Sequence, residues 1–144
     1  MSWTAGAAAA ALLVGGSVVT MAGTAAQAQV RPTVTSTSAT VVHVAFRKGF
    51  GKMLVTAKGG HALYEHPSGP CTGTCLSVWP ALNMPTGKTT PLGASCLATV
   101  TVGSNLQVTY NGQKLYTFTG DSGHMVTGNG LGGFVVAKMV KACP

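Results

Sequence analysis

The chain has 144 residues, of which nine are Lys or Arg and only two are Asp or Glu, so its net charge at neutral pH is +7. This balance favours anionic partners, such as phosphate-bearing cell-wall or envelope polymers and lipid headgroups. The basic residues are scattered and no nucleic-acid motif accompanies them, which argues against specific nucleic-acid binding. Catalysis by paired carboxylates would require Glu65 and Asp121, because the chain has no others.

An Ala-rich apolar run opens the chain and ends in the A-x-A pattern Ala26-Gln27-Ala28. This pattern predicts that residues 1–28 are a secretory signal peptide, which places the mature protein outside the cytoplasm, in the periplasm or the cell wall. No Lys or Arg precedes the run, so two alternatives stay open: the true start lies upstream, or the segment is retained as an anchor. Its Gly, Ser and Thr residues make it a poor membrane span, and no stable span is expected after cleavage.

Residues 29–40 are rich in Ser and Thr without apolar periodicity, which predicts a flexible linker before a β domain at residues 41–144. Alternating apolar residues predict a first strand at Val41 to Phe46. Met53 to Thr56 and His61 to Tyr64 flank Gly59-Gly60, which predicts a hairpin.

Prolines interrupt the segment from His66 to Pro91, where we expect irregular structure and one helical turn around Cys75 to Val78. A strand is predicted at Leu97 to Val102. Later in the chain, a Gly-rich loop over residues 121–133 precedes a final strand at Phe134 to Val140.

Leu106 to Tyr110 and Gln113 to Phe118 are predicted to form a hairpin around Asn111-Gly112, a favoured sequence for a two-residue turn. In this register Leu115 lies on one face, while Tyr116 and Phe118 lie on the other. Because both faces carry large apolar groups, a second sheet or the segment that contains Trp79 must cover one of them.

The chain also contains an internal repeat. Leu63-Tyr64 matches Leu115-Tyr116, and Trp79 matches Phe134 at the same distance beyond a Thr-Gly pair. Two related units, at about residues 53–85 and 106–140, would pack against each other. We therefore predict a mainly β fold: a small antiparallel β domain, sandwich-like or roll-like, built from two pseudo-repeated hairpin units and disulfide-bonded.

Four cysteines follow the predicted signal: Cys71, Cys75, Cys96 and Cys143. An even number in a small exported domain indicates two disulfides, and three pairings are open. We favour Cys71–Cys75, which closes a tight turn, with Cys96–Cys143, which ties the C-terminal tail to the middle of the chain. The second closes the longer loop and is expected to stabilise the fold more.

The stretch Tyr116 to Asp121, Y-T-F-T-G-D, fits the Y-x-(F/W/Y)-x-x-D motif of a family of secreted and lipoprotein repeats. The C-x-G-x-C stretch from Cys71 and the following Trp79-Pro80 also resemble that family, and the resemblance covers roughly residues 41–140. The first unit lacks the second aromatic and the Asp of the motif, Phe134 stands where members usually have Trp, and no lipobox Cys is present. The family has no settled activity, so the resemblance implies an exported envelope domain.

Asp121 is the first candidate for chemistry. It would act as a ligand or base beside Tyr116, or it would cap the Ser122-Gly123 turn through its carboxylate, and we favour the cap. No G-x-S-x-G motif is present, and Glu65 occupies a non-equivalent place in its unit. We therefore expect no catalytic residue and no enzyme activity.

Two binding sites are also considered. Tyr64, Trp79 and Tyr116 would form a glycan-binding platform if exposed, although aromatic residues on strands are more often core, which we favour. The donor residues His61, His66, His124 and Met125 suit copper or iron, but their spacing matches no H-x3-H, C-x2-C-H or blue-copper pattern.

We therefore expect a secreted, non-catalytic cell-envelope domain with a binding or structural role, without metal or cofactor and with an oligomeric state that the sequence leaves open. The alternative is an extracytoplasmic metal- or haem-binding redox accessory protein that uses His124, Met125 and His66. The candidate binding residues are the motif aromatics Tyr64, Trp79, Tyr116 and Phe118, together with Asp121 and His124.

Overall fold

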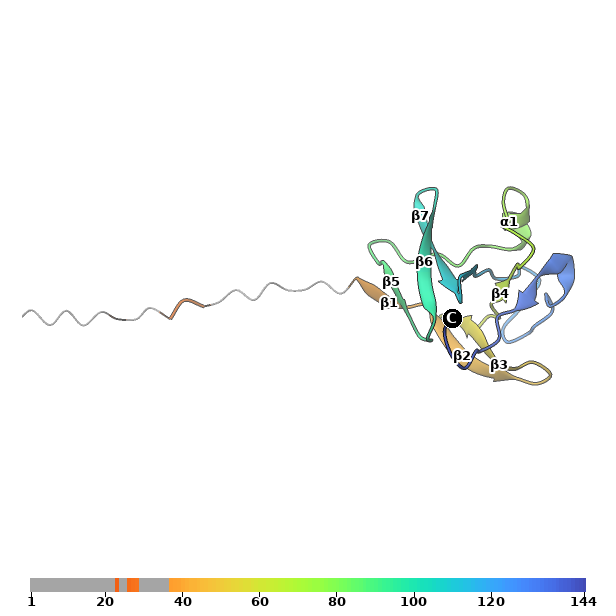
Figure 1. The fold of residues 1–144 in the computed structure, drawn as a ribbon, viewed down its shortest axis with the longest axis horizontal. Coiled ribbons are helices and arrows are strands. Elements are labelled where there is room, and N and C mark those ends of the chain that lie inside the picture. Colours follow the sequence, from red (N-terminus) through yellow and green to blue (C-terminus); the bar gives the residue numbers. More distant parts are fainter. Residues whose placement is uncertain (1–22, 24–25, 29–36) are drawn as a thin grey trace, which may run out of the picture. The chain divides into compact units, whose positions relative to one another are not determined.

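A computed structural model describes residues 23, 26–28 and 37–144 (Figure 1). Residues 37–144 belong to one compact, mainly β unit. The rest of the predicted signal peptide, residues 1–28, and most of the predicted linker, residues 29–40, lie outside the described residues. Over the residues that are described, none of the helices has the length and apolar character needed to cross a membrane.

Short strands make up most of the domain, with one α-helical turn and one 3₁₀ turn. In chain order the elements are β1 (Ser38–Thr40), β2 (Val42–Arg47), β3 (Gly51–Thr56), β4 (Tyr64–Glu65), α1 (Cys75–Val78), β5 (Thr90–Leu92), β6 (Leu97–Val102), β7 (Asn105–Tyr110), β8 (Gln113–Lys114), η1 (Leu131–Gly133) and β9 (Val135–Val136). They form small sheets with the orders β1-β5, β2-β3, β4-β9 and β6-β7-β8. All pairs are antiparallel except β1 and β5, which confirms the prediction of a mainly β domain with antiparallel sheets.

Two hairpins dominate the domain, β2–β3 and β6–β7 (Figure 1). The turn that joins β7 to β8 has positive φ at both central residues, 52° at Asn111 and 80° at Gly112, as a type I′ turn requires. Tyr110 pairs with Gln113, which is the predicted register. The helical turn Cys75–Val78 and the strand Leu97–Val102 also coincide with their predictions.

Three predicted strands are shorter than expected. The predicted return strand His61 to Tyr64 makes only an isolated bridge, from Ala62 to Val55, before β4 begins at Tyr64. β8 ends at Lys114, and Tyr116 instead makes isolated antiparallel bridges to Tyr64 and Ala81. The final strand is reduced to β9, with a further isolated bridge from Lys138 to Met53. The last two segments change strand partners along their length, which interrupts a continuous ladder.

Two predictions near the domain's N-terminal edge were wrong. The last residues of the predicted linker form β1, and β1 pairs in parallel with β5, inside the Pro-rich segment predicted to be irregular. Pro91 is the central residue of β5 and donates no hydrogen bond, but a two-stranded sheet consists of edges, where Pro is tolerated. The flanking N–H groups make the bonds instead, from Thr90 to Thr37 O and from Val41 to Leu92 O.

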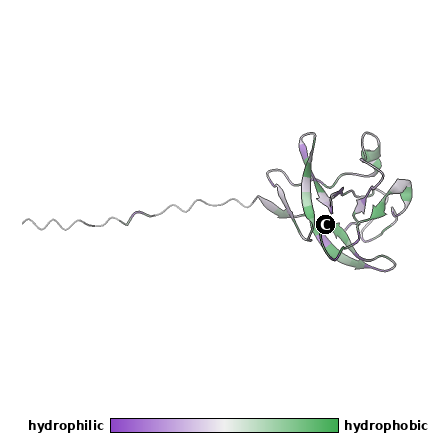
Figure 2. Cartoon of the chain, viewed as in Figure 1, coloured by the Kyte–Doolittle hydropathy of each residue, from purple (hydrophilic) through white to green (hydrophobic). Residues whose placement is uncertain are grey.

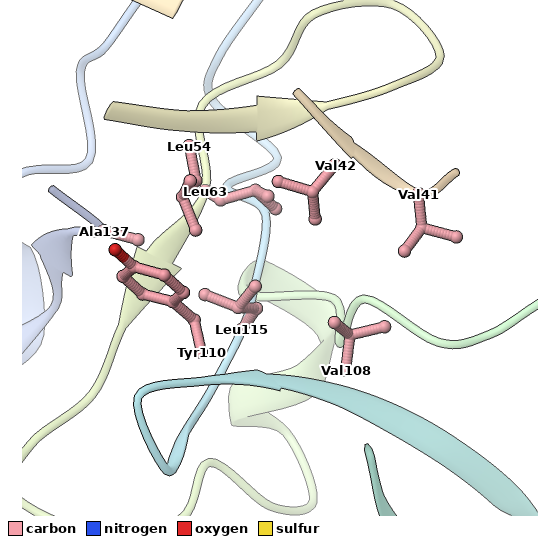
Figure 3. Close-up of a cluster of buried hydrophobic side chains, with 8 residues drawn as sticks. All are labelled: Val41, Val42, Leu54, Leu63, Val108, Tyr110, Leu115 and Ala137. Atoms are coloured by element: carbon pink, nitrogen blue, oxygen red, sulfur yellow. The ribbon is translucent and has the colours of Figure 1, made fainter. Parts of the chain in front are cut away.

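β3 and the segments beside it separate two hydrophobic clusters. Leu54 faces the first cluster and Met53 faces the second, because successive side chains of a strand point to opposite faces. The first cluster gathers buried side chains from both hairpins: Val41, Val42, Leu54, Leu63, Val108, Tyr110, Leu115 and Ala137 (Figure 3). Figure 2 accordingly shows hydrophobic residues distributed over the strands of both hairpins.

Two disulfides are present, Cys71–Cys75 and Cys96–Cys143. This is the pairing that the sequence favoured. The second bridge fixes the C-terminal tail to the residue that precedes β6, across 47 positions of sequence. Neither bridge crosses between the first half of the domain and the second.

Candidate functional site

The second hydrophobic cluster is built around stacked aromatic rings. Trp79 lies parallel to Phe134, with ring centroids 3.8 Å apart, and stacks on Phe118 at 4.5 Å. Tyr64 meets Trp79 edge-on at 5.3 Å, and Tyr116 meets Phe134 edge-on at 5.5 Å. We call these five residues the aromatic cluster. The segment that contains Trp79 therefore covers the second face of the Asn111-Gly112 hairpin.

Four of the five residues of the aromatic cluster are buried in the core, and Phe118 is partly buried. Tyr64 and Tyr116 are 0% and 1% exposed, and Trp79 is 6% exposed. Offset and edge-on rings stabilise a core beyond their buried area. The preference for a core role is therefore confirmed, and the three rings offer no exposed surface for a glycan to stack on.

Asp121 fixes the Gly-rich loop to this core. Tyr64 Oη donates to Asp121 Oδ2 at 2.6 Å and accepts from the Gly128 N–H at 3.1 Å. Asp121 Oδ1 accepts from both the N–H and the hydroxyl of Thr127, each at 2.7 Å. Burial, together with the hydrogen bond to Asp121, raises the pKa of Tyr64 well above its ordinary value, while the Gly128 N–H opposes this shift. The fold therefore keeps this hydroxyl protonated.

The sequence anticipated a structural Asp121 but assigned it the wrong partners. The carboxylate bonds to Thr127, six residues on, instead of capping the Ser122-Gly123 turn, and it lies beside Tyr64 instead of Tyr116. The Tyr116 hydroxyl accepts from the Cys71 N–H at 3.3 Å. Thr127 was noted only as part of a Thr-Gly repeat match, because a side chain that closes a loop onto an Asp leaves no local spacing signal.

Glu65 points away from Asp121, the other acidic residue. Tyr64 points into the aromatic cluster towards Asp121, so its neighbour Glu65 points away from it. Glu65 lines a separate cleft of about 370 Å³ with Tyr110 and Lys138, and burial raises the pKa of its carboxyl group. Because catalysis by paired carboxylates requires both groups to flank one bond, this arrangement does not provide a pair.

His66 is held within the fold. Its ring stacks on Phe134 with centroids 4.3 Å apart. Nδ1 lies against the carbonyl of Gly69, and Nε2 lies 3.1 Å from the carbonyl of Gly132. Both ring nitrogens therefore face backbone oxygens, and neither is directed at a metal position.

His124 and Met125 lie on the exposed loop after Asp121. The His124 ring approaches Gly60 so closely that a Cβ there would lie 3.2 Å from its Nε2, and the Met125 sulfur accepts from the Ser122 hydroxyl at 3.2 Å. Among the residues that the structure describes, no three His, Cys, Asp or Glu side chains are grouped to hold a metal ion. His66 lies against the carbonyls of Gly69 and Gly132, whereas His124 lies against Gly60.

Several shallow clefts open on the surface. One of about 310 Å³ has His66, Lys114 and Tyr116 in its lining. A larger one of about 740 Å³ is bordered by His43 and Lys58. Their basic lining agrees with the charge of the whole chain, and neither contains an acidic residue.

Positive charge gathers on the β2–β3 hairpin and the strand segment beside it. Arg47, Lys48 and Lys52 occupy the end of the hairpin, and Lys138 lies on the neighbouring segment, which bridges to β3. Arg47 is fixed in place, because its Nη2 donates to the Gly60 carbonyl at 3.2 Å. Arg47, Lys48 and Lys52 lie within six residues of sequence, and strand pairing adds only Lys138 to them. We call these four residues the basic hairpin group.

No protein-family model, curated protein or solved structure matches this chain. The resemblance to the repeat family with the Y-x-(F/W/Y)-x-x-D motif therefore stays a prediction.

Proposed function

We propose that this protein is a non-catalytic, extracytoplasmic domain that binds anionic polymers of the cell envelope. The observation that carries the proposal is the basic hairpin group on a surface from which acidic groups are nearly absent. Of the two carboxylates, Asp121 is engaged by Tyr64 and Thr127, and Glu65 is half-buried. A surface of one charge sign attracts polymers of the opposite sign and binds them in a salt-dependent way.

Export is supported by the two disulfides, since such bridges persist in oxidising compartments outside the cytoplasm. A binding role without catalysis is supported by the orientation of Glu65 away from Asp121 and by the position of both His66 ring nitrogens against backbone carbonyls of the fold.

We also propose that the domain contains two copies of one unit that exchange their final segments. In the first unit three residues form a closed ring of backbone hydrogen bonds. Leu54 N donates to Ala137 O, Ala137 N donates to Leu63 O, and Leu63 N donates to Leu54 O. Ala137 lies three residues after Phe134.

The second unit has the same ring. Val108 N donates to Leu82 O, Leu82 N donates to Leu115 O, and Leu115 N donates to Val108 O. Leu82 lies three residues after Trp79, the residue matched to Phe134 in the sequence repeat. Each unit therefore takes its third segment from the part of the chain that follows the other hairpin.

Contacts between matched residues also support the exchange. Trp79 and Phe134 stack on each other, and the backbones of Tyr64 and Tyr116 exchange two hydrogen bonds. Two related units around a pseudo-twofold axis make such contacts, because each residue near the axis meets its own counterpart. A chain divided after the exposed Gly87 tests this, since each disulfide lies within one half. The halves should fold only together, and independent folding of either half contradicts the exchange.

The polymer-binding proposal is tested by titrating the oxidised domain with soluble polyphosphate at low and high salt. We expect binding at low salt that weakens steeply as salt rises. The variant Arg47→Gln, Lys48→Gln, Lys52→Gln should lose most of the affinity, whereas Lys114→Gln on β8 should lose little. Salt-independent binding, or equal loss in both variants, contradicts the role of the basic hairpin group.

A further inference from the structure

The β2–β3 hairpin exposes a phenylalanine at its end. Val42, Val44 and Phe46 occupy one face of β2, and their exposure rises along the strand from 0% to 39% to 71%. The apolar face of β2 therefore starts in the core and runs out into solvent, where Phe46 is the most exposed large hydrophobic residue in the described part of the chain.

One lysine shares the face of this ring, and two further basic residues follow it in the chain. Phe46 pairs across the hairpin with Lys52, so the two side chains lie on the same face, and Arg47 and Lys48 follow it directly in the chain. Arg47 Nη1 donates to the Phe46 carbonyl at 3.3 Å. Phe46 and Lys52 thus share one face of the hairpin end, Lys48 lies in the adjoining turn, and Arg47 points to the opposite face, where it bonds to the Gly60 carbonyl.

Phe50 anchors the hairpin end to the core. The Phe50 N–H donates to the Arg47 carbonyl at 3.0 Å and closes the turn, and the Phe50 ring packs against the cluster that contains Tyr64 and Trp79. Gly49 and Gly51 have positive φ, 85° and 77°, which the tight reversal requires. Because the backbone of the hairpin end is already fixed, binding a partner through Phe46 requires no loss of loop conformational entropy.

The β6–β7 hairpin provides an internal comparison. It has the same antiparallel pairing over six residues on each strand, but no charged residue occurs from Leu97 to Tyr110. The exposed hydrophobic residues there are Val100 and Val102, at 37% and 39%. A solvent-exposed aromatic ring that shares a face with a lysine is therefore a feature of the first hairpin and not a requirement of the hairpin fold.

We propose that the β2–β3 hairpin end docks on a phospholipid bilayer with anionic headgroups, with Phe46 inserted at the headgroup boundary. An aromatic ring that shares a face with Lys52 and adjoins the turn residue Lys48 suits the membrane interface, where the ring leaves water while the cations remain at the phosphates. A soluble polyanion offers no apolar layer and would require only the cations. The inference rests on the proposed affinity for anionic envelope material and specifies a lipid surface as one such partner.

The test measures binding of the oxidised domain to vesicles of phosphatidylglycerol and phosphatidylcholine. We expect Phe46→Ala to lower the vesicle affinity by about tenfold or more, because it removes an inserted aromatic side chain. Leu131→Ala removes another exposed hydrophobic side chain, on η1, and should leave the affinity unchanged. Phe46→Trp places a fluorophore at the tip, and its emission should shift to shorter wavelength on vesicles but not on polyphosphate.

The outcomes separate the two proposals. If Phe46→Ala binds vesicles as tightly as the wild type, or if the Trp at position 46 stays in water on bound vesicles, membrane insertion is refuted. If the wild type binds polyphosphate but no vesicles, insertion is again refuted while the polymer-binding proposal stands. If the wild type binds neither probe, both proposals fail. Since Phe46 is exposed, thermal unfolding of each variant should match the wild type and exclude misfolding as the cause.

Discussion

Replacing Tyr64 by Phe removes one oxygen atom from the centre of the aromatic cluster and leaves the ring in place. That oxygen donates to the Asp121 carboxylate at 2.6 Å and accepts from the Gly128 N–H at 3.1 Å. A hydrogen bond to a charged group contributes about 1.5–3 kcal/mol, and an unsatisfied buried N–H adds a cost of about 1–3 kcal/mol. We therefore expect the free energy of unfolding to fall by about 3 kcal/mol.

Urea denaturation of the oxidised protein at neutral pH measures this loss, with Tyr116→Phe as the matched control. The Tyr116 hydroxyl accepts a single neutral bond, at 3.3 Å from the Cys71 N–H, so its removal should cost about 1 kcal/mol. If the two variants lose equal stability, or if Tyr64→Phe loses less than its control, the Tyr64–Asp121 bond does not hold the Gly-rich loop to the core.

The same residue gives the fold a dependence on high pH. Burial and the Asp121 hydrogen bond raise the pKa of Tyr64 above its ordinary value of about 10. The unfolded chain therefore loses this proton first, and the stability that protonated Tyr64 contributes is complete below about pH 10 and declines as the pH rises beyond it. In Tyr64→Phe the free energy of unfolding should decline less steeply above about pH 10, because one titrating group is absent. Parallel pH profiles for the two proteins contradict the assignment.

Three further predictions concern stability and are measured by urea denaturation. Loss of the Cys96–Cys143 bridge, which spans 47 positions, should cost about 4 kcal/mol, against about 2 kcal/mol for the shorter bridge; the reverse order contradicts the loop-entropy argument. Gly93→Ala should destabilise by more than about 3 kcal/mol, because its Cβ would lie 1.6 Å from the Val42 carbonyl oxygen at a φ of 123°; a neutral effect would show that this approach is wrong. Glu65→Gln should stabilise the fold at neutral pH by less than about 1 kcal/mol, because burial raises the pKa of Glu65 and disfavours its charged form. That gain should vanish below about pH 4, where the carboxyl is protonated in both states, and a gain that persists there refutes its electrostatic origin.

Local signals predicted the elements that local chemistry controls. The turn at Asn111-Gly112 was predictable because a type I′ turn needs positive φ at both central residues, which few residues other than Asn and Gly adopt. The alternation of apolar and polar residues located the strand Leu97–Val102. The opposite faces of Leu115 and Tyr116 followed from the period of a strand, and the two residues lie in different clusters.

What failed were the features set by distant partners. Pro91 lies in strand β5 because β5 pairs with only one neighbour, β1, so the missing N–H can face away from the sheet. β1 itself consists of residues without apolar periodicity. The bond between Tyr64 and Asp121 joins positions 57 residues apart, and the place of Lys138 beside the β2–β3 hairpin depends on which strands pair. Composition gave the charge of the surface, but only the fold shows where Phe46 and its neighbouring cations meet.

The central claim, that the domain binds anionic envelope material through the β2–β3 hairpin, is tested most directly by sedimentation with cell envelopes isolated from the producing organism. The oxidised domain should pellet with the envelopes at low salt, be released as the salt concentration rises, and remain largely in the supernatant when Arg47, Lys48 and Lys52 are replaced by Gln. Full recovery of the wild-type domain in the supernatant at low salt would contradict the claim.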